Sequence, residues 1–571
     1  MSKRPPVVCE VVRRGRLLVA EPFFEDGQQF SLGRRGSPAA TAGMLVAVRP
    51  AAGRAVVVEE LGSPRDLAAV LRGFAIEAGV GEPFPDDVLN EAELAALEPD
   101  GLDPGRIDLR DVPCVTIDPP TARDFDDAIA VLPDGDGLRV LVHIADVAFH
   151  VRPGGPIDRE AERRAFSVYL PGHVEPMLPH ALSSSACSLL PDRPRRAVTV
   201  DIHVSADGTL GSPRFLRSLI QSSARLTYDE VREILEQGAE HPQSELLRRA
   251  DAFAATRRSA RFARGALALS ARELVITVAD GSVRSASWDT EPRAHALVEE
   301  LMLLANEAVA TLLATKRVPA LYRVHDQPDE EAVERLLGRM AALGVPIAPM
   351  PETPTGPDLM RVIGRQAVLV AKEVTRRGHG QEALTSQLLR SMRLALYAAA
   401  PHGHAGLASP AYTHFTSPIR RYPDLIVHRA LLAATSSSEI APDAAELAAI
   451  AEHCSVVERE ASGVERRADR ICLAWLLREQ LQRDGLHQSF PGEIIGLISA
   501  GLFVRFASVF EGFVPVRRLS VTGDWFELDE HGVALQGRSG FRYRLGDAID
   551  VVVSSIDAPR GKVTLDVTDN M

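Results

Sequence analysis

The chain has 571 residues, of which 46% are hydrophobic and 25% are charged, a balance that allows a large folded core with smaller modules and excludes gross disorder. No run approaches the roughly 18 apolar residues that span a bilayer, and no apolar signal segment follows the first residues, so we expect a cytoplasmic protein without membrane contacts. The net charge of −13 argues against a protein that coats nucleic acid over its whole surface, although a local basic groove is compatible with it.

The cysteines and basic residues narrow the chemistry further. Five cysteines are scattered and never spaced as CxxC, which indicates neither a disulfide framework nor a zinc ribbon: Cys9, Cys114, Cys187, Cys454 and Cys472. Of the 64 basic residues only four are lysine, so nearly all the positive charge is guanidinium, a group suited to bidentate phosphate contacts. A GC-rich coding bias explains the arginine excess equally well.

The first segment of the chain predicts a small barrel. Short apolar runs, separated by glycine, proline and charged turns, occur at residues 7–12, 17–20, 43–48 and 55–58. We therefore expect one OB-fold or cold-shock-like β-barrel over residues 1–62. Ser63, followed by Pro64, predicts a helix with Ser63 as its N-cap, which Gly79 ends within a helical connector over residues 63–110.

The stretch from residue 113 to residue 130 contains the strongest chemical signal. Four carboxylates, Asp118, Asp124, Asp126 and Asp127, lie within ten positions between apolar runs that we interpret as buried strands. Anions held this close repel one another and lose hydration, which favours either a cation among them or raised pKa values. Oxygen ligands favour Mg²⁺ or Mn²⁺ over zinc, and the register of an EF-hand calcium loop is absent. The pattern indicates a metal-dependent phosphoryl-transfer centre.

The rest of the chain predicts a hairpin, several helices and a second barrel. A turn over residues 132–137 returns the chain as an antiparallel strand, Thr227 begins a helix with a capping box, and long helices are expected over 294–313 and from 444 to about 484. Short alternating strands then predict a C-terminal OB-fold barrel over 487–571, at residues 492–498, 501–506, 512–516, 542–545 and 548–556. Phe503 on the second of these strands suits base stacking.

A cationic segment lies between these helices. Ser417, which precedes a proline, can start a helical turn whose free N–H groups attract anions. Arg420 and Arg421 add positive charge that can be directed at a phosphate. The segment therefore supplies a partner for the acidic stretch, although two neighbouring prolines leave its local geometry open.

Taken together, these blocks resemble the ribonuclease II / ribonuclease R family of 3′-to-5′ exoribonucleases. The resemblance extends from about residue 60 to the end of the chain and rests on ordered blocks at 116–128, 143–147, 167–170, 176–179, 227–228, 300–306, 322–325, 414–424 and 543–547. It implies an α+β, multidomain fold, in which a central mixed α/β RNB catalytic domain over 111–486 is flanked by the N-terminal barrel and by a C-terminal S1-type barrel.

The resemblance also implies roles for individual residues. The four aspartates would bind Mg²⁺, or Mn²⁺, and position the attacking water, while Arg420 would lie near the scissile phosphate. RNA contacts are implied, besides Phe503 and Arg420, for Tyr169, which would stack a base near the 3′ end, and for Arg421, Tyr322, His325 and Glu465. The implied activity is processive hydrolysis of single-stranded RNA to nucleoside 5′-monophosphates, by a monomer without an obligate protein partner.

The sequence departs from the family pattern at several points. There is room for one N-terminal barrel instead of two, and a lysine-rich tail is absent, so degradation of structured RNA is not implied. Phe149 replaces a usual histidine, and Ala165 with Phe166 replaces a common Gly-Thr. Two alternatives stay open: a catalytically weak RNA-binding or regulatory protein of the same fold, and a different metal phosphodiesterase such as a DNA exonuclease.

Overall fold

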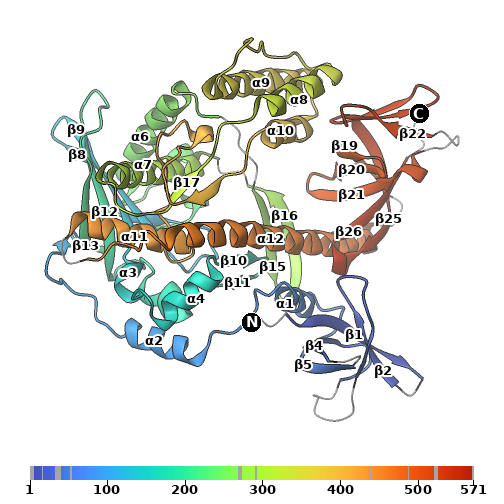
Figure 1. The fold of residues 1–571 in the computed structure, drawn as a ribbon, viewed down its shortest axis with the longest axis horizontal. Coiled ribbons are helices and arrows are strands. Elements are labelled where there is room, and N and C mark those ends of the chain that lie inside the picture. The colour runs from blue at the N-terminus through green and yellow to red at the C-terminus, as the bar shows by residue number, and fades with distance from the viewer. Residues whose placement is uncertain are drawn as a thin grey trace.

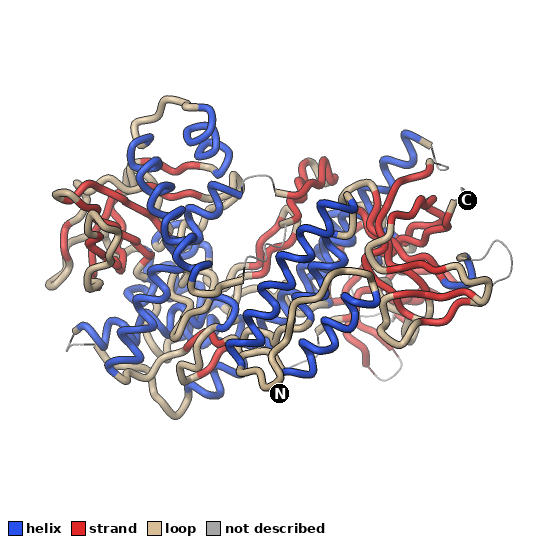
Figure 2. The backbone as a smooth tube through the Cα atoms, turned by 90° about the horizontal axis from the view of Figure 1, so that it is seen from above, coloured by secondary structure: helices blue, strands red, loops and turns tan. Residues whose placement is uncertain are grey.

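The computed structural model describes residues 5–15, 17–32, 40–51, 54–267, 273–289, 292–436, 439–485, 488–519 and 525–568. Figure 1 shows a large sheet with its helices on one side and two small barrels on the other, with helix α12 (Leu447–Asp484) running between them. Seen from above in Figure 2, helices fill the space between the two groups of strands. Among the described residues, no helix has the length and apolar character needed to cross a bilayer.

The N-terminal segment forms a closed five-stranded barrel in the order β1-β2-β3-β5-β4, as predicted. Its strands are β1 (Val7–Arg14), β2 (Leu17–Pro22), β3 (Phe30–Leu32), β4 (Leu45–Ala51) and β5 (Arg54–Gly62). Alternate side chains such as Val11, Val46 and Val48 fill the interior. The sequence pattern does not predict β3, because three residues are too few to show an alternation.

Helix α1 (Leu67–Glu77) follows the barrel, and its start corrects one prediction. The N-cap is Asp66, whose side chain accepts a hydrogen bond from the Ala68 N–H at 3.1 Å, so the prediction of Ser63 as N-cap is wrong. The Ser63 hydroxyl accepts from the Arg65 N–H at 3.2 Å instead, in a turn that precedes the helix. The connector continues through α2 (Asp86–Ala96).

The largest sheet has seven strands in the order β14-β7-β8-β9-β12-β13-β6. They are β6 (Ile107–Asp108), β7 (Val115–Ile117), β8 (Asp127–Asp134), β9 (Gly137–Ala145), β12 (Pro194–Val204), β13 (Arg214–Gln221) and β14 (Ala224–Leu226). β8 and β9 form the predicted hairpin, and Gly135 has a φ of 61° in its turn, a conformation that favours glycine. β7 and β8 are the buried strands predicted on either side of the acidic stretch.

Helices and short hairpins surround this sheet. The helices are α3 (Val147–His150), α4 (Pro156–Arg164), α5 (Tyr228–Arg232), α6 (Ser244–Ala263), α7 (Pro292–Lys316), α8 (Glu330–Ala342), α9 (Gly356–Arg377), α10 (Gln381–Arg390) and α11 (Tyr422–Thr435). The two-stranded sheets pair β10 (Val168–Leu170) with β11 (His173–Glu175), β15 (Leu274–Ala279) with β16 (Ser282–Trp288), and β17 (Tyr322–Val324) with β18 (Leu396–Ala398). The predicted long helices are confirmed as α7 and α12, and the predicted capping box at Thr227 begins α5.

The C-terminal barrel is closed in the order β19-β20-β21-β26-β25. Its strands are β19 (Ser489–Ile498), β20 (Gly501–Phe506), β21 (Phe510–Pro515), β25 (Ala548–Asp557) and β26 (Lys562–Val567). The prediction that residues 542–545 supply a barrel strand is wrong. That segment is β24 (Arg542–Arg544), which belongs to a separate sheet with β22 (Phe526–Leu528) and β23 (Ala534–Gly537). An alternating pattern shows that a segment is a strand but does not show which strand it pairs with.

One hydrophobic cluster joins segments that are far apart in the sequence. It contains Leu45 of the N-terminal barrel, Phe74 of α1, Leu170 of β10, Leu477 of α12 and Val504 of the C-terminal barrel. Both barrels are therefore packed onto α12 through a continuous core, and are not tethered by linkers alone. The same cluster contains one of the five cysteines, all of which are buried and free, as the sequence predicts.

Candidate active site

The acidic loop between β7 and β8 is fixed by backbone hydrogen bonds from three directions. The Asp118 N–H donates to the carbonyl oxygen of Leu226 at the end of β14, at 3.0 Å. The hydroxyl of Ser188, which is fully buried, accepts from the Phe125 N–H at 3.0 Å and donates to the Arg123 carbonyl at 2.9 Å. The Asp126 carbonyl accepts from the Ala145 N–H of β9 at 2.8 Å. The loop therefore presents its carboxylates from a rigid frame.

Three of the four carboxylates, those of Asp118, Asp126 and Asp127, are held by the fold in an anionic and poorly solvated environment. Burial raises the pKa of Asp118, and the negative charges of Asp127 and Asp124 raise it further. Burial also raises the pKa values of Asp126, which is 3% exposed, and of Asp127. The Oδ2 atoms of Asp118 and Asp126 are buried without a hydrogen-bond partner. Such a site favours either protons or a cation at these oxygens.

The segment around Arg420 meets this loop at Asp126. The Ile419 N–H donates to Asp126 Oδ1 at 2.8 Å, and Arg420 Nε lies 3.6 Å from Asp126 Oδ2. A second N–H of the segment, that of Ser417, donates to Asp424 Oδ1 at 2.8 Å. The turn thus does attract anions through its N–H groups, but these two anions are carboxylates of the protein itself. The Arg420 side chain is 43% exposed, which leaves its guanidinium accessible to a substrate.

Tyr169, on strand β10, contacts the acidic loop from an element 45 positions further along the chain. Its hydroxyl donates to Asp124 Oδ2 at 2.9 Å, and the residue is 38% exposed. Burial raises the pKa of this hydroxyl, so it remains a hydrogen-bond donor. Its backbone N–H donates to Glu465 Oε1 on α12, also at 2.9 Å. The structure therefore brings Tyr169 and Glu465 into one contact chain with Asp124.

The remaining predicted RNA-binding residues occupy different surroundings. Arg421 is mostly buried and its guanidinium is held by Asp424 at 2.6 Å. Tyr322 is 3% exposed on β17. His325 Nδ1 accepts from the Gly406 N–H at 2.9 Å and Nε2 lies 2.7 Å from the Arg393 carbonyl oxygen, so both ring nitrogens are engaged. Phe503 is 41% exposed on β20, where its ring lies 5.1 Å from that of Phe513.

Tyr228 is a residue of the site that the sequence does not identify. It follows the capping Thr227, which suggests only a helix start, and its ring stacks on His295 at 3.6 Å between centroids. Burial raises the pKa of Tyr228, and the negative charges of Asp127 and Asp118 raise it further. The stacking on His295 joins residues 67 positions apart, a contact that no local pattern predicts.

Two departures from the family pattern also find an explanation. Phe149 stacks on the guanidinium of Arg196, 3.9 Å from its ring centroid, beside a buried network in which Arg106 pairs with Asp146 at 2.8 Å. Ala165 has a φ of 54°, a conformation that favours glycine, and its carbonyl accepts from the Tyr422 N–H at 2.8 Å. Ala165 therefore adopts a backbone conformation that glycine would adopt at lower cost, held by the hydrogen bond to Tyr422.

The oxygen atoms of the acidic loop decide which metal ion could bind there. Within the described ranges, no three His, Cys, Asp or Glu side chains converge closely enough to hold a metal ion by themselves. Mg²⁺ usually keeps several waters and is bound through one or two carboxylates together with phosphate oxygens. The partnerless carboxylate oxygens of Asp118 and Asp126 fit such an ion. A structural zinc site with four protein ligands does not fit them.

Comparisons with known proteins converge on one family. The RNB domain family matches residues 106–437. Ribonuclease R of Escherichia coli is 36% identical over 498 residues, which cover 83% of this chain and 59% of that protein. Ribonuclease R of Aquifex aeolicus is 33% identical over 538 residues, which cover 91% of this chain and 73% of that protein. The chain thus spans about three fifths of the length of the first of these curated relatives.

Solved structures show the same likeness over nearly the whole chain. RNase R of Mycoplasma genitalium, in complex with ribose-methylated single-stranded RNA, superposes with a TM-score of 0.88 at 26% identity, covering 99% of this chain and 90% of that chain. Yeast Ssd1, a pseudonuclease, superposes with a TM-score of 0.69 at 17% identity, covering 94% of this chain and 68% of that chain. The second likeness shows a shared fold and nothing more.

Proposed function

Because the chain belongs to the ribonuclease R family of RNB-domain proteins, we propose that it is an exoribonuclease, which hydrolyses single-stranded RNA from the 3′ end and releases nucleoside 5′-monophosphates. The observation that carries this proposal is the meeting of Arg420 with the buried Asp126, in a loop that also carries the carboxylates of Asp118, Asp124 and Asp127. A relative from Mycoplasma genitalium has been solved with single-stranded RNA, which supports the same substrate class here. The division of the chain at residues 62, 110 and 486 is part of the proposal, and the two closed barrels support it.

The proposed cofactor is Mg²⁺, with Mn²⁺ as a substitute. Asp118, Asp124, Asp126 and Asp127 would hold it, since one loop carries all four carboxylates and burial raises the pKa values of Asp118, Asp126 and Asp127, so that a cation among them would offset their negative charge. When bound, a divalent ion lowers the pKa of a coordinated water and offsets the charge of the phosphate. The same ion would relieve the repulsion that raises the pKa of Asp118.

The chain's own residues would position the phosphate and stabilise its developing charge. Arg420 is tethered at 3.1 Å to the Ser417 hydroxyl and lies 3.6 Å from Asp126, so its guanidinium is held near the carboxylates before substrate arrives. Preorganised cations of this kind stabilise the oxygens of a phosphoryl group in the transition state. Asp126 is in turn fixed by the Ile419 N–H, which links the acidic loop to the arginine turn.

The RNA strand would be read mainly by stacking. Tyr169 and Phe503 expose their rings, and aromatic rings stack bases with little dependence on sequence. Arg421, Tyr322 and His325 are still only predicted to contact RNA. Because they are mostly buried, we propose that they shape the channel through which the strand passes. Glu465 is proposed to act through the backbone of Tyr169.

A labelled RNA assay tests the proposal. Protein, Mg²⁺ and a 5′-labelled single-stranded oligoribonucleotide are mixed, and the length of the labelled strand is followed by electrophoresis while released nucleotides are identified by chromatography. We expect progressive shortening with release of 5′-monophosphates, and no reaction with the matched DNA oligomer. RNA binding without any released nucleotide would contradict the enzyme and favour an RNA-binding protein of the same fold. Equal degradation of DNA would contradict the substrate class.

A further inference from the structure

The β10–β11 hairpin carries Tyr169 and is held by contacts to four parts of the molecule: the acidic loop, α12, α1 and β15. At one end, the Tyr169 hydroxyl donates to Asp124 Oδ2 at 2.9 Å. From α12, Glu465 Oε1 accepts from the Tyr169 N–H at 2.9 Å. The flanking Val168 and Leu170 are buried in the hydrophobic cluster that contains the C-terminal half of α12. The position of the Tyr169 hydroxyl is therefore set by the packing of its hairpin on α12.

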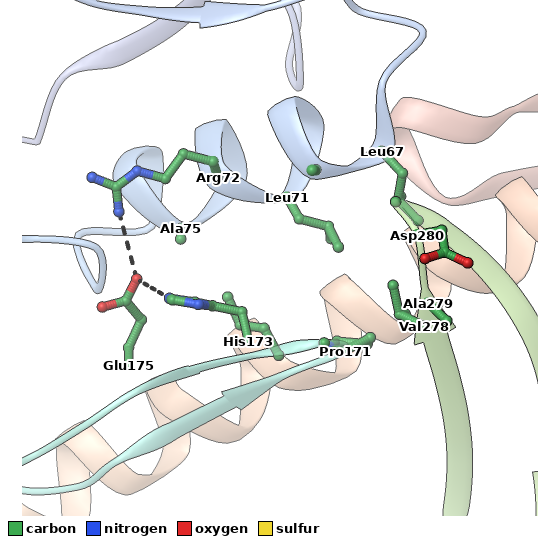
Figure 3. A pocket seen from close by; sticks show the side chains of 14 residues that line it. Leu67, Leu71, Arg72, Ala75, Pro171, His173, Glu175, Val278, Ala279 and Asp280 are labelled. Carbon is green, nitrogen blue, oxygen red and sulfur yellow. Dashed lines mark hydrogen bonds and ion pairs between the residues drawn. The ribbon is translucent and has the colours of Figure 1, made fainter. Parts of the chain in front are cut away.

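The far strand of the hairpin is held from α1, as Figure 3 shows. Arg72 of α1 and His173 both point at Glu175, with Arg72 Nη1 at 3.6 Å and His173 Nε2 at 2.9 Å from Glu175 Oε1. A cavity of about 380 Å³ separates α1 from the hairpin at this point, so these polar bridges, and not close packing, span the gap. At the turn, Gly172 packs against β15, where an added Cβ would lie 3.1 Å from the Cβ of Val278.

Asp124 itself is loosely held compared with its neighbours. Asp126 is clamped by the Ile419 N–H at 2.8 Å and is buried. Asp124 is partly exposed in the middle of the loop, and among the described contacts its carboxylate accepts only from Tyr169 at 2.9 Å and, through Oδ1, from the Arg123 N–H at 3.4 Å. The longer contact is weak. The tyrosine hydroxyl is therefore the main group that fixes the direction of this carboxylate.

We propose that Tyr169 is a positioning residue for Asp124: its hydroxyl fixes the orientation of that carboxylate, and Glu465 and the Arg72–Glu175 pair hold the hairpin so that the hydroxyl reaches it. This rests on the proposed function, in which Asp124 is one of the ligands of the divalent ion. Groups that orient a metal ligand from behind typically contribute about 10-fold to 100-fold in metal affinity or activity. Tyr169 thus has two separable parts, a ring for stacking and a hydroxyl for Asp124.

The decisive comparison is between Tyr169→Phe and Tyr169→Ala. Tyr169→Phe keeps the ring, so we expect the KM for RNA and the length of the final product to stay at wild-type values, while kcat falls about 10-fold. Tyr169→Ala removes both parts, and should change the final product as well as kcat. A readout independent of turnover is Mn²⁺ binding measured by calorimetry, which should weaken about 10-fold in Tyr169→Phe.

Two further variants separate positioning from general damage. Tyr543→Phe is the matched control, since it also removes a tyrosine hydroxyl hydrogen bond, at 3.2 Å to the Leu519 carbonyl, in a sheet away from Asp124. Glu465→Ala removes the acceptor for the Tyr169 N–H and should reproduce the loss of kcat and of Mn²⁺ affinity, whereas Glu465→Gln keeps an oxygen that can accept and should lose less of both. In the double variant of Glu465→Ala and Tyr169→Phe the losses should not multiply, because both act through Asp124.

The outcomes distinguish this inference from the proposed function. A wild-type protein that releases no nucleotide from RNA would overturn the proposed function and this inference with it. If the wild-type protein degrades RNA while Tyr169→Phe retains wild-type kcat and Mn²⁺ affinity, only the positioning role is overturned. A Tyr169→Phe protein that loses kcat but keeps Mn²⁺ affinity, with losses that multiply with those of Glu465→Ala, would also overturn it, since the two residues would then act independently.

Discussion

Asp126 combines burial with a place at the junction of two segments nearly three hundred positions apart. Its Oδ1 accepts from the Ile419 N–H at 2.8 Å, while Oδ2 faces Arg420 and has no hydrogen-bond partner. An asparagine at this position keeps an oxygen for the Ile419 N–H and nearly the same volume. Substitution therefore removes the negative charge while leaving the fold of the junction in place.

For Asp126→Asn we expect turnover to fall by at least about 100-fold, with the Kd for RNA within a few-fold of wild type, because charge at the reacting centre stabilises the transition state more than the bound strand. Single-turnover kinetics and filter binding measure the two quantities. Asp134→Asn, at the exposed end of the same strand β8, is the matched control and should retain wild-type values. Wild-type turnover in Asp126→Asn would refute the assignment of the acidic loop as the active site.

Arg420 offers a second test at the scale of one side chain. The Arg420 guanidinium uses two different nitrogens, Nη2 for the Ser417 hydroxyl and Nε for Asp126. Arg420→Lys keeps the positive charge but has a single nitrogen, which cannot take both positions. We expect kcat to fall by about 10-fold to 1000-fold, in the range found for groups that stabilise transition-state charge. If Arg420→Lys matches wild type in single-turnover rate, charge alone suffices and the geometric role is wrong.

At the scale of elements, long and strongly patterned segments were predictable from the sequence, whereas the exact ends of elements were not. The strands on both sides of the acidic loop are predicted because their apolar runs must be buried, and α7 and α12 are predicted because their periodicity persists over many turns. The predicted N-cap of α1 is wrong by three residues, because Ser63 and Asp66 are both good N-cap residues and the local pattern does not choose between them.

The candidate site follows the same division. Asp118, Asp124, Asp126 and Asp127 lie within ten positions, so the sequence alone predicts that one loop carries them. The hydrogen bond from Tyr169 to Asp124 joins residues 45 positions apart, and that from the Ile419 N–H to Asp126 joins residues 293 positions apart. Such contacts are set by tertiary packing, which single-sequence periodicity does not encode.

β9 also contains a buried histidine that makes the sheet sensitive to acid. His143 Nδ1 lies 2.8 Å from the Thr199 hydroxyl on β12, and burial lowers the pKa of His143 from 6.5 to about 3, with Asp201 and Arg139 as the nearby charges. Below pH 6.5 the unfolded chain takes up a proton at this histidine that the folded protein does not. Stability is therefore lost as the pH falls from 6.5 towards 3.

His143→Gln should reduce this loss. Between pH 7 and pH 5, the decrease in the free energy of unfolding should be about 2 kcal/mol smaller in the variant than in the wild type. Urea unfolding followed by circular dichroism at the two pH values measures the difference. His203→Gln, which removes an exposed histidine on the neighbouring β12, is the control and should not reduce the loss. An unchanged pH dependence in His143→Gln would mean that this histidine is not kept neutral in the folded sheet.

At the scale of the whole molecule, the shared hydrophobic cluster ties the stability of the two barrels together. It contains side chains from the N-terminal barrel, α1, β10, β16, α12 and the C-terminal barrel. Leu477 on α12 is 1% exposed within it. A cavity at this position would weaken the packing of both barrels at once, although they lie at opposite ends of the sequence.

We expect Leu477→Ala to cost about 2–5 kcal/mol and to speed amide hydrogen exchange in both barrels, while the exchange of β8 and β9, which belong to another cluster, changes little. Hydrogen–deuterium exchange with mass spectrometry gives the pattern segment by segment. Leu94→Ala on α2, where the side chain is 69% exposed, is the matched control and should leave exchange unchanged. Faster exchange in only one barrel would show that the cluster does not couple them.

The 38-residue helix α12 also connects the two barrels to the candidate site. Arg467, two positions after Glu465, lies 3.3 Å from Glu25, which follows β2 of the N-terminal barrel. Gly561, between β25 and β26 of the C-terminal barrel, packs so closely on α12 that an added Cβ would lie 2.8 Å from the backbone of Arg470. Both barrels therefore meet the helix within five positions of the residue that accepts from the Tyr169 N–H, about 8 Å along its axis. A shift of either barrel is thereby passed through one short stretch of helix to the hairpin that carries Tyr169.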